Sequence, residues 1–272
     1  MRLSHSLDGK TMTSKGVLPL AAMGMCLAVP AMALTVCADP DYLPYSNRSG
    51  DGFENKIAVA VARLLGETVQ YTWASHRGHG GFSQFLSSTL DAGKCDVVMS
   101  IPYGSREELT TKPYYTSSYV FVFPKSKQYD IATMDSPVLK RMKIGFERET
   151  PAEDALKMRG LLPGSVVGFD VSDEGGGSPE IMLAALKDGK IDVLITWQPA
   201  IGAFLRDYPG MDVVVIPNTR ALGAPEQYSF PMSMGVREGN NELKNKLDEV
   251  IEKHQPELTS ILTESGVLVS FK

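Results

Sequence analysis

Apolar residues along this chain recur at two spacings from residue 34 onward. Runs with a period of two predict strands, and runs with a spacing of three to four predict helices. The predicted strands are 34–38, 68–73, 94–100, 117–123, 142–146, 164–171, 191–197, 211–217 and 229–239. The predicted helices are 53–65, 82–92, 151–158, 179–186, 200–205 and 241–261, with a short helix or turn at 136–140. The run 191–197 is nearly all apolar, which is typical of a central parallel strand buried on both faces.

The segment 34–66 combines a strand, a loop rich in proline and tyrosine, a glycine turn and an amphipathic helix that ends at Gly66. Asp39, Tyr42 and Tyr45 follow the strand directly, and ligands of open α/β sheets bind beyond the carboxyl ends of strands. We therefore expect these three residues at a binding site. An ordinary strand, loop and helix without a ligand would show the same pattern.

Strands and helices alternate in an order that predicts two α/β lobes. We place lobe 1 at 34–122 plus 228–272 and lobe 2 at 123–227. Two extended crossings, near 119–123 and 228–236, would connect the lobes. Lobes hinged in this way can close on something between them.

The first 33 residues have the pattern of a secretory signal peptide. A basic start precedes the apolar run 16–27, which is too short to span a bilayer. Pro30 and the small residues at 31–33 favour a cleavage site over a membrane anchor. We predict cleavage before Leu34, export to the periplasm and no membrane span in the mature chain.

Composition excludes some classes of protein. The chain has 272 residues, of which 43% are hydrophobic, and this length and hydrophobic content suffice for two lobes that each bury a core. Its formal net charge is −5. Its acidic balance without basic blocks argues against a nucleic-acid partner.

Two cysteines, Cys37 and Cys95, remain after the predicted cleavage. In an oxidising compartment an even pair usually bonds. Each cysteine lies in or beside a predicted strand, and neighbouring parallel strands would bring their Cα atoms within disulfide range. We predict a disulfide. The alternative of a catalytic thiol finds no histidine placed by sequence to serve either cysteine.

A glycine-rich loop at 75–81 contains His76 and His79. Metal ligation is conceivable, but no carboxylate or cysteine completes a ligand set at suitable spacing. We therefore predict a solvated loop, with no metal site and no cofactor.

Six motifs in the chain resemble those of the periplasmic solute-binding proteins that bind polar amino acids. They are VCADPDYLPYSN, GFENKIAVAVARLLG, LDAGKCDVVMS, TTKPYYTSSYVFV, LKDGKIDVLITWQP and PMSMGVREGNNELKNKLDEVI. They occur in the family's order and cover essentially the whole mature chain. The resemblance implies the type II periplasmic binding protein fold, in which two Rossmann-like lobes are joined by two hinge crossings.

The ligand signature of the amino-acid binders is kept only in part. Their carboxylate-binding arginine lies in the loop after the third strand, which makes Arg106 a candidate. An exposed arginine beside two glutamates would look the same. Trp197 stands where those proteins carry the acidic residue that meets the ligand ammonium. A cation–π contact could replace that carboxylate, but the departure argues against an amino-acid ligand.

Within the family, the segments CADPDYLPYSN, GFENKIA, KCDVV and LTTKPYY resemble the corresponding segments of one branch. This branch is the J-type accessory proteins of quinoprotein methanol dehydrogenases, called MxaJ and XoxJ. This resemblance implies a periplasmic protein that is not itself a catalyst. Its implied partners are a pyrroloquinoline-quinone (PQQ) methanol or alcohol dehydrogenase and the cytochrome c of that system. Two paired cysteines fit a structural disulfide in that branch.

Three functions follow from these observations. The first, which we prefer, is an accessory protein whose aromatic cleft of Tyr42, Tyr45, Tyr103 and Trp197 receives a piece of protein, although such aromatics could also merely pack between the lobes. The second is an ABC-transporter receptor for a small polar metabolite. The third is an enzyme, for which Asp39, Glu54 and Glu147 are the available carboxylates, but their spacing pairs none of them for acid–base work.

Overall fold

The protein is described by a computed structural model. It describes residues 32–77, 80–106, 108–162, 164–171 and 177–270, all within one compact unit. Residues 1–31, which form most of the predicted signal peptide, lie outside the described residues. Cleavage before Leu34 stays a prediction. The described part of the chain contains no helix with the length and apolar character needed to cross a bilayer.

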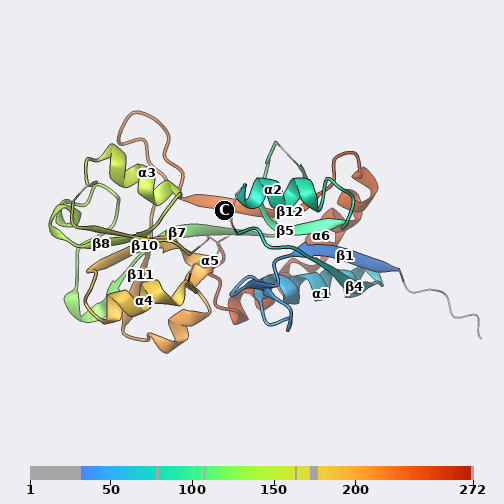
Figure 1. The fold of residues 1–272 in the computed structure, drawn as a ribbon, viewed down its shortest axis with the longest axis horizontal. Helices are drawn as coiled ribbons and strands as arrows, with labels where there is room; N and C mark the ends of the chain where they lie inside the picture. The colour runs from blue at the N-terminus through green and yellow to red at the C-terminus, as the bar shows by residue number, and fades with distance from the viewer. Residues whose placement is uncertain (1–31, 78–79, 107, 163, 172–176, 271–272) are drawn as a thin grey trace, which may run out of the picture. The chain divides into compact units, whose positions relative to one another are not determined.

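One ten-stranded sheet organises the fold, in the main order β4-β1-β5-β12-β7-β10-β8-β9 (Figure 1). Its first half consists of β4 (Thr68–Trp73), β1 (Ala33–Ala38), β5 (Val97–Pro102) and β12 (Ser229–Val236). β1 is parallel to both β4 and β5, whereas β12 is antiparallel to β5. The carboxyl end of β1 therefore lies inside the sheet, between β4 and β5.

Two long strands run from the first half of the sheet into the second. The first part of β7 (Tyr115–Pro124), up to Ser118, pairs with β12. From Tyr119 onward β7 pairs instead with β10 and β11. These strands lie at the crossings predicted from the sequence. The exact lobe boundaries stay a prediction.

The second half of the sheet contains β10 (Val193–Trp197), β8 (Ile144–Glu147), β9 (Val166–Phe169) and β11 (Met211–Val215). Val193, Leu194 and Ile195 are fully buried, as predicted for a central strand. The prediction of parallel neighbours was right on one side only. β10 is parallel to β8 but antiparallel to β7, because β7 enters this half as a crossing strand that runs the other way.

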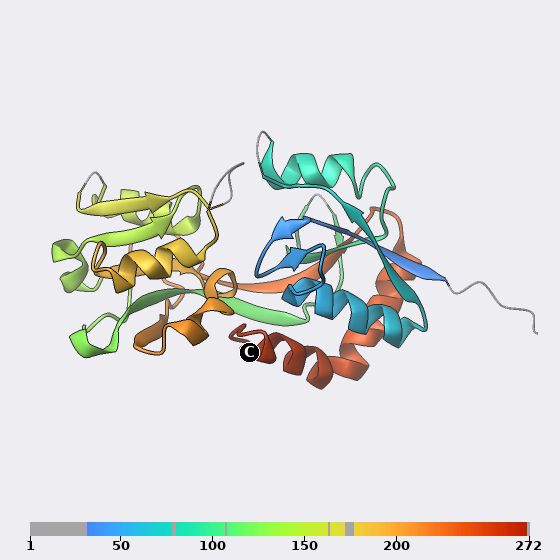
Figure 2. The same ribbon diagram turned by 60° about the horizontal axis from the view of Figure 1, so that its bottom comes forward.

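Helices cover both faces of the first half. α1 (Phe53–Leu65) and α6 (Asn241–Glu264) lie on one face, and α2 (Gly81–Ser88) lies on the other (Figure 2). Phe53, Ile57 and Val61 are fully buried in the core with α6, and Leu64 packs against that core, as expected of the apolar face of the predicted amphipathic helix. Gly66 ends α1 with a φ of 76°, the left-handed conformation expected of a glycine cap. α2 ends four residues earlier than predicted, because the chain turns at Thr89.

The remaining elements are short. They are β2 (Asp41–Tyr42), β3 (Ser46–Asn47), β6 (Leu109–Thr110), α3 (Pro151–Met158), α4 (Glu180–Lys187), α5 (Gln198–Ile201) and the 3₁₀ turns Lys125–Lys127, Pro137–Arg141 and Phe204–Asp207. The helix predicted at 200–205 is thus one α-turn followed by a 3₁₀ turn. The change occurs at Gly202, where a Cβ would overlap the backbone of Gly266. α6 is kinked at His254, two residues before Pro256, which cannot donate a backbone hydrogen bond.

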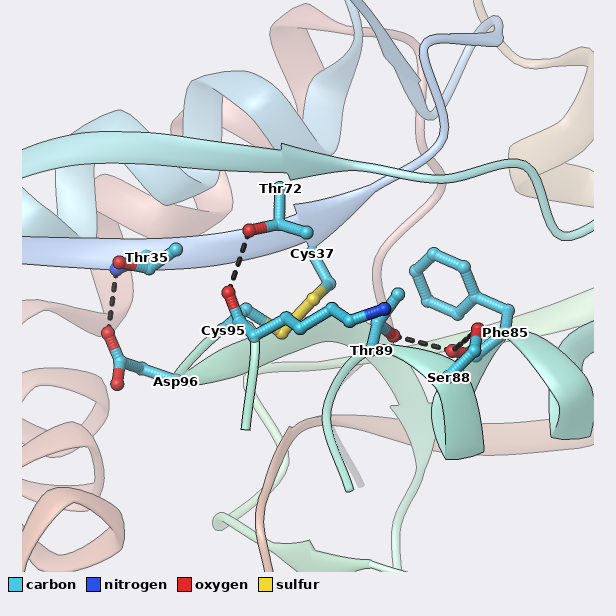
Figure 3. Close-up of a disulfide and its surroundings, with 9 residues drawn as sticks. Thr35, Cys37, Thr72, Phe85, Ser88, Thr89, Cys95 and Asp96 are labelled. Carbon is cyan, nitrogen blue, oxygen red and sulfur yellow. Dashed lines mark hydrogen bonds between the residues drawn. A yellow bond between two sulfur atoms is a disulfide. The ribbon is translucent and has the colours of Figure 1, made fainter. Parts of the chain in front are cut away.

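The predicted disulfide between Cys37 and Cys95 is present, with their Cα atoms 5.6 Å apart (Figure 3). Cys37 belongs to β1, and Cys95 lies in the turn just before β5. Phe85 and Leu90, in and after α2, pack in the same buried cluster as the two cysteines. The disulfide thus ties the end of β1 to the segment that leads into β5.

A buried ion-pair network stabilises the second half of the sheet. The Arg159 guanidinium donates to both carboxylate oxygens of Glu226, over 2.6 and 2.8 Å, and also to Asp135. The Tyr228 hydroxyl donates to Glu226 over 2.9 Å. This network joins the end of α3 to the segment that leads into β12. No local pattern indicates this network, since Arg159 and Glu226 are 67 residues apart in the sequence.

Candidate functional site: an aromatic and acidic cleft

Two adjoining cavities lie at the carboxyl ends of β1 and β8, with volumes of about 560 and 340 Å³. They share a wall formed by Tyr42, Tyr45, Pro102, Tyr119, Trp197 and Met232. We call the two together the cleft, the larger one the β1 cavity and the smaller one the β8 cavity. Residues from both halves of the sheet line the cleft, as expected where two hinged lobes meet.

The loop 39–47 forms one wall of the β1 cavity. Its backbone is fixed by α1, because Phe53 N donates to Pro44 O and Glu54 N donates to Tyr45 O, both over 2.9 Å. The rings of Tyr42 and Tyr45 stack with centroids 4.6 Å apart. A Cβ at Gly52 would overlap the Tyr45 backbone, so this turn position requires glycine. The tyrosine faces are therefore held rigidly.

Asp39 lies at the base of this loop with its side chain only 3% exposed. Its carboxylate accepts hydrogen bonds from Asp41 N (2.8 Å), Ser75 Oγ (3.0 Å) and His76 N (3.0 Å). Burial alone would raise the pKa of Asp39, but the hydrogen bonds from His76, Asp41 and Ser75 outweigh it and hold this pKa well below its ordinary value. Asp39 does line the β1 cavity as expected, but its oxygens already have partners, which favours a positioning role.

His76 corrects the prediction of a solvated loop. Its Nδ1 lies 3.2 Å from Asp39, and its ring meets the edge of Tyr42 with centroids 4.1 Å apart. Its side chain is 14% exposed and lines the β1 cavity. The sequence pattern hid this contact because the carboxylate partner lies 37 residues away. His79 lies outside the described residues. Among the described ones, no group of three or more histidine, cysteine or acidic residues is arranged to hold a metal ion.

Glu54 and Ser100 lie together in the lining of the β1 cavity. The Ser100 hydroxyl lies 3.0 Å from Tyr114 Oη and 3.1 Å from Tyr115 Oη, and Ser100 also hydrogen-bonds Glu54. Burial raises the pKa of Glu54 to about 7, although the hydrogen bond with Ser100 opposes the rise. Ser100 has a φ of 56°, a strained value for a serine within a strand.

Glu147 ends β8 and lines the β8 cavity. It is 9% exposed, and its carboxylate makes no hydrogen bond or ion pair with another described residue. Burial raises the pKa of Glu147 to about 7. Its charge acts on the hydroxyls of Tyr42 and Tyr119, whose pKa values are raised by burial first and by this carboxylate second. The acid thus faces the aromatic wall.

Trp197 ends β10 and lines both cavities, as expected from the sequence. Its ring centroid lies 5.4 Å from that of Tyr119 and 5.9 Å from that of Phe230. Tyr119 and Trp197 are register partners on β7 and β10, so the sheet itself brings them together. The sequence did not single out Tyr119 or Phe230 as site residues, because both lie in strands that were expected to serve only as crossings.

Two residues predicted for the cleft lie elsewhere. Tyr103 is 55% exposed, Arg106 is exposed, and neither lines either cavity. The chain turns away from the cleft at Gly104, with a φ of 79°, and continues into β6, which pairs with β12. Arg106 is therefore not placed to bind a ligand carboxylate in the cleft.

The described lining of the cleft is rich in acidic side chains. It includes Asp39, Glu54, Glu147 and Glu149 but no lysine or arginine. A bound amino acid would find acidic groups for its ammonium but no cationic side chain for its carboxylate. The lining thus agrees with the departure of Trp197 from the amino-acid-binding pattern.

Comparison with known proteins gives consistent results. The family model described as bacterial extracellular solute-binding proteins, family 3, matches residues 34–262. Protein MoxJ of Methylorubrum extorquens is 32% identical over 253 residues, covering 88% of this chain and 82% of that protein.

Two solved structures are similar over the full length of their own chains. MxaJ from Methlophaga aminisulfidivorans MPT has a TM-score of 0.75 and 25% identity, and covers 87% of this chain. The periplasmic binding protein XoxJ from Methylobacterium extorquens AM1 has a TM-score of 0.71 and 31% identity, and covers 88% of this chain. These similarities confirm the type II two-lobed fold and the J-type resemblance predicted from the sequence.

Proposed function

Because the chain belongs to the bacterial extracellular solute-binding proteins of family 3, we propose that it is a periplasmic, non-catalytic accessory protein of a PQQ-dependent methanol or alcohol dehydrogenase. In this proposal the cleft receives a segment of the dehydrogenase or of its cytochrome c, and this contact aids maturation or activation. The similarity to MoxJ, MxaJ and XoxJ supports the assignment to this system. The predicted signal peptide supports the periplasmic location.

The observation that carries the proposal is the aromatic wall of the cleft. Tyr42, Tyr45, Tyr119, Trp197 and Phe230 line it from both halves of the sheet. Large aromatic side chains in partly desolvated pockets contribute most to protein–protein binding. A protein segment can use such a wall without the arginine clamp that an amino-acid ligand needs.

Calorimetric titration of the mature protein with the purified dehydrogenase, and separately with its cytochrome c, tests the proposal. We expect saturable binding to at least one of them. Trp197→Ala should weaken this binding at least about tenfold, because it removes a shared part of both cavity walls. Trp73→Ala is the matched control, since Trp73 stacks on Tyr71 outside the cleft and its removal should leave the affinity unchanged.

A receptor for a small polar metabolite is the second candidate function, since cavities of about 560 and 340 Å³ also fit small molecules. A thermal-shift screen of small metabolites separates the two functions, because a ligand that binds the native state raises the melting temperature. Saturable stabilisation by a metabolite, with no binding of dehydrogenase or cytochrome, would replace our proposal with this one.

A further inference from the structure

The β8 cavity combines a buried acid with aromatic faces. Glu147 is about nine-tenths buried and has no hydrogen-bonding or ion-pairing partner among the described residues. Around it, Tyr42, Tyr119, Trp197 and Phe230 line the same cavity. A carboxylate withdrawn from water without a partner is costly to keep ionised. A bound group that supplied the missing partner would remove that cost.

The surroundings of Glu147 favour a positive charge on the bound group. The face of an aromatic ring is the negative end of its quadrupole, so it attracts cations. The other acids of the cleft, Asp39, Glu54 and Glu149, add negative charge, and the described lining contains no lysine or arginine. Its histidine, His76, is already paired with Asp39. A neutral donor can hydrogen-bond Glu147 but leaves the negative charge of the cleft uncompensated, and an anionic occupant would be repelled.

We propose that the β8 cavity binds a basic side chain, a lysine ammonium or an arginine guanidinium, carried on a segment of the partner protein. Glu147 is its ion-pair partner, and Tyr119, Trp197 and Phe230, which line the same cavity, surround the charge and the aliphatic stem. The identity of the partner rests on the proposed function above. The preference for a cation does not.

A side chain on a peptide segment explains the cleft better than a free small amine. The β8 cavity shares a wall with the larger β1 cavity, whose lining adds the apolar side chains Phe82, Phe85 and Val98. One extended segment can place its basic residue at Glu147 and its apolar neighbours in the β1 cavity. A single small cation would leave the larger cavity to water.

Peptide titrations test the cation directly. We would titrate the mature protein with acetyl-Phe-Lys-Phe-amide, with its arginine counterpart and with its norleucine counterpart, which keeps the stem but removes the charge. We expect the lysine or the arginine peptide to bind at least about tenfold more tightly than the norleucine peptide. Equal binding of all three, or no binding of either basic peptide at millimolar concentration, would overturn the inference. Cadaverine, as a free amine, should bind more weakly than the basic peptides; if it binds as tightly, a protein segment is not the occupant.

Glu147→Gln tests the residue, because glutamine keeps the shape and removes the charge. It should weaken the basic peptide at least about tenfold and leave the norleucine peptide unchanged. Glu242→Gln changes the net charge equally, at an exposed site on α6, and should leave all affinities unchanged. If Glu147→Gln behaves like Glu242→Gln, Glu147 is not the partner.

The same variants separate the two proposals. If the dehydrogenase or cytochrome binds and the binding depends on Trp197 but not on Glu147, the proposed function stands and the cation site is wrong. If neither protein binds but the basic peptides bind through Glu147, the cation site stands and the proposed partner is wrong.

Discussion

The two sides of the cleft hold their buried acids in opposite ways. On the β1 side, Asp39 accepts hydrogen bonds from three residues, and the disulfide of Cys37 lies two residues away. On the β8 side, Glu147 is buried to a similar extent but has no partner among the described residues. The pKa of Asp39 is lowered, and that of Glu147 is raised to about 7. Burial alone therefore does not decide the charge; the number of available donors does.

Asp39 therefore stabilises the structure of the site, whereas the carboxylate of Glu147 is available to a ligand. Glu226, in the same half of the sheet as β8, is as fully paired as Asp39 through Arg159. Lack of a partner is thus a local property of the cleft end of β8. Removing the charge of Asp39 and removing that of Glu147 should therefore change the stability in opposite directions.

The largest expected effect comes from the disulfide that holds the β1 side. Cys37→Ser with Cys95→Ser should lower the free energy of unfolding by about 3–4 kcal/mol, mainly through the larger entropy of the unfolded chain. Urea unfolding of oxidised protein measures the loss. Reductant should destabilise the natural protein by a similar amount and leave the double variant unchanged. If reductant has no effect on the natural protein, the disulfide does not hold this wall.

Asp39→Asn should have a smaller effect of the same sign. The amide keeps one acceptor oxygen but turns an NH₂ group toward the donors from Ser75 and His76, so we expect a loss of about 2 kcal/mol at pH 7. Thermal and urea unfolding measure it, with the exposed neighbour Asp41→Asn as control. The difference between the two variants should shrink in acid, because the lowered pKa of Asp39 gives stability that is lost as pH falls through the folded-state value. A stable Asp39→Asn protein would mean that these hydrogen bonds do not fix the loop.

Glu147→Gln should have an effect of the opposite sign. The folded-state pKa of about 7 lies above the ordinary value of 4.5, so Glu147 binds a proton in the folded state that the unfolded state has lost. Its penalty on stability is therefore nil below pH 4.5, grows as pH rises toward 7 and is constant above that. At pH 8 the variant should be more stable than the natural protein by about 1–3 kcal/mol.

The pH dependence provides the check on Glu147. At pH 4.5 the glutamine variant and the natural protein should unfold at the same urea concentration, and the difference should appear between pH 5 and 7. Glu54 contributes in the same direction, since burial also raises its pKa to about 7, and Glu54→Gln serves as a comparison. A gain that does not change with pH would show that it comes from packing and not from the carboxylate charge.

Most of the architecture could be predicted from local patterns. Helices α1 and α3 begin at the predicted residues, Phe53 and Pro151, because a glycine turn and a proline mark those starts in the sequence. The pairing of Cys37 with Cys95 followed from counting cysteines. The direction of β7 beside β10 did not, because period-two alternation carries no information on which neighbour a strand takes.

The sequence by itself determined which side chains follow the strands: Asp39, Tyr42 and Tyr45 after β1, and Trp197 at the end of β10. Only the tertiary structure decided what each one does. It brings Ser75 and His76 to Asp39, leaves Glu147 among aromatic rings with no partner from the described residues, and carries Tyr103 and Arg106 away from the cleft. The physical reason is that the state of a buried carboxylate depends on donors within about 3 Å. Those donors come from segments distant in sequence, so the spacing of apolar and polar residues along the chain does not predict them.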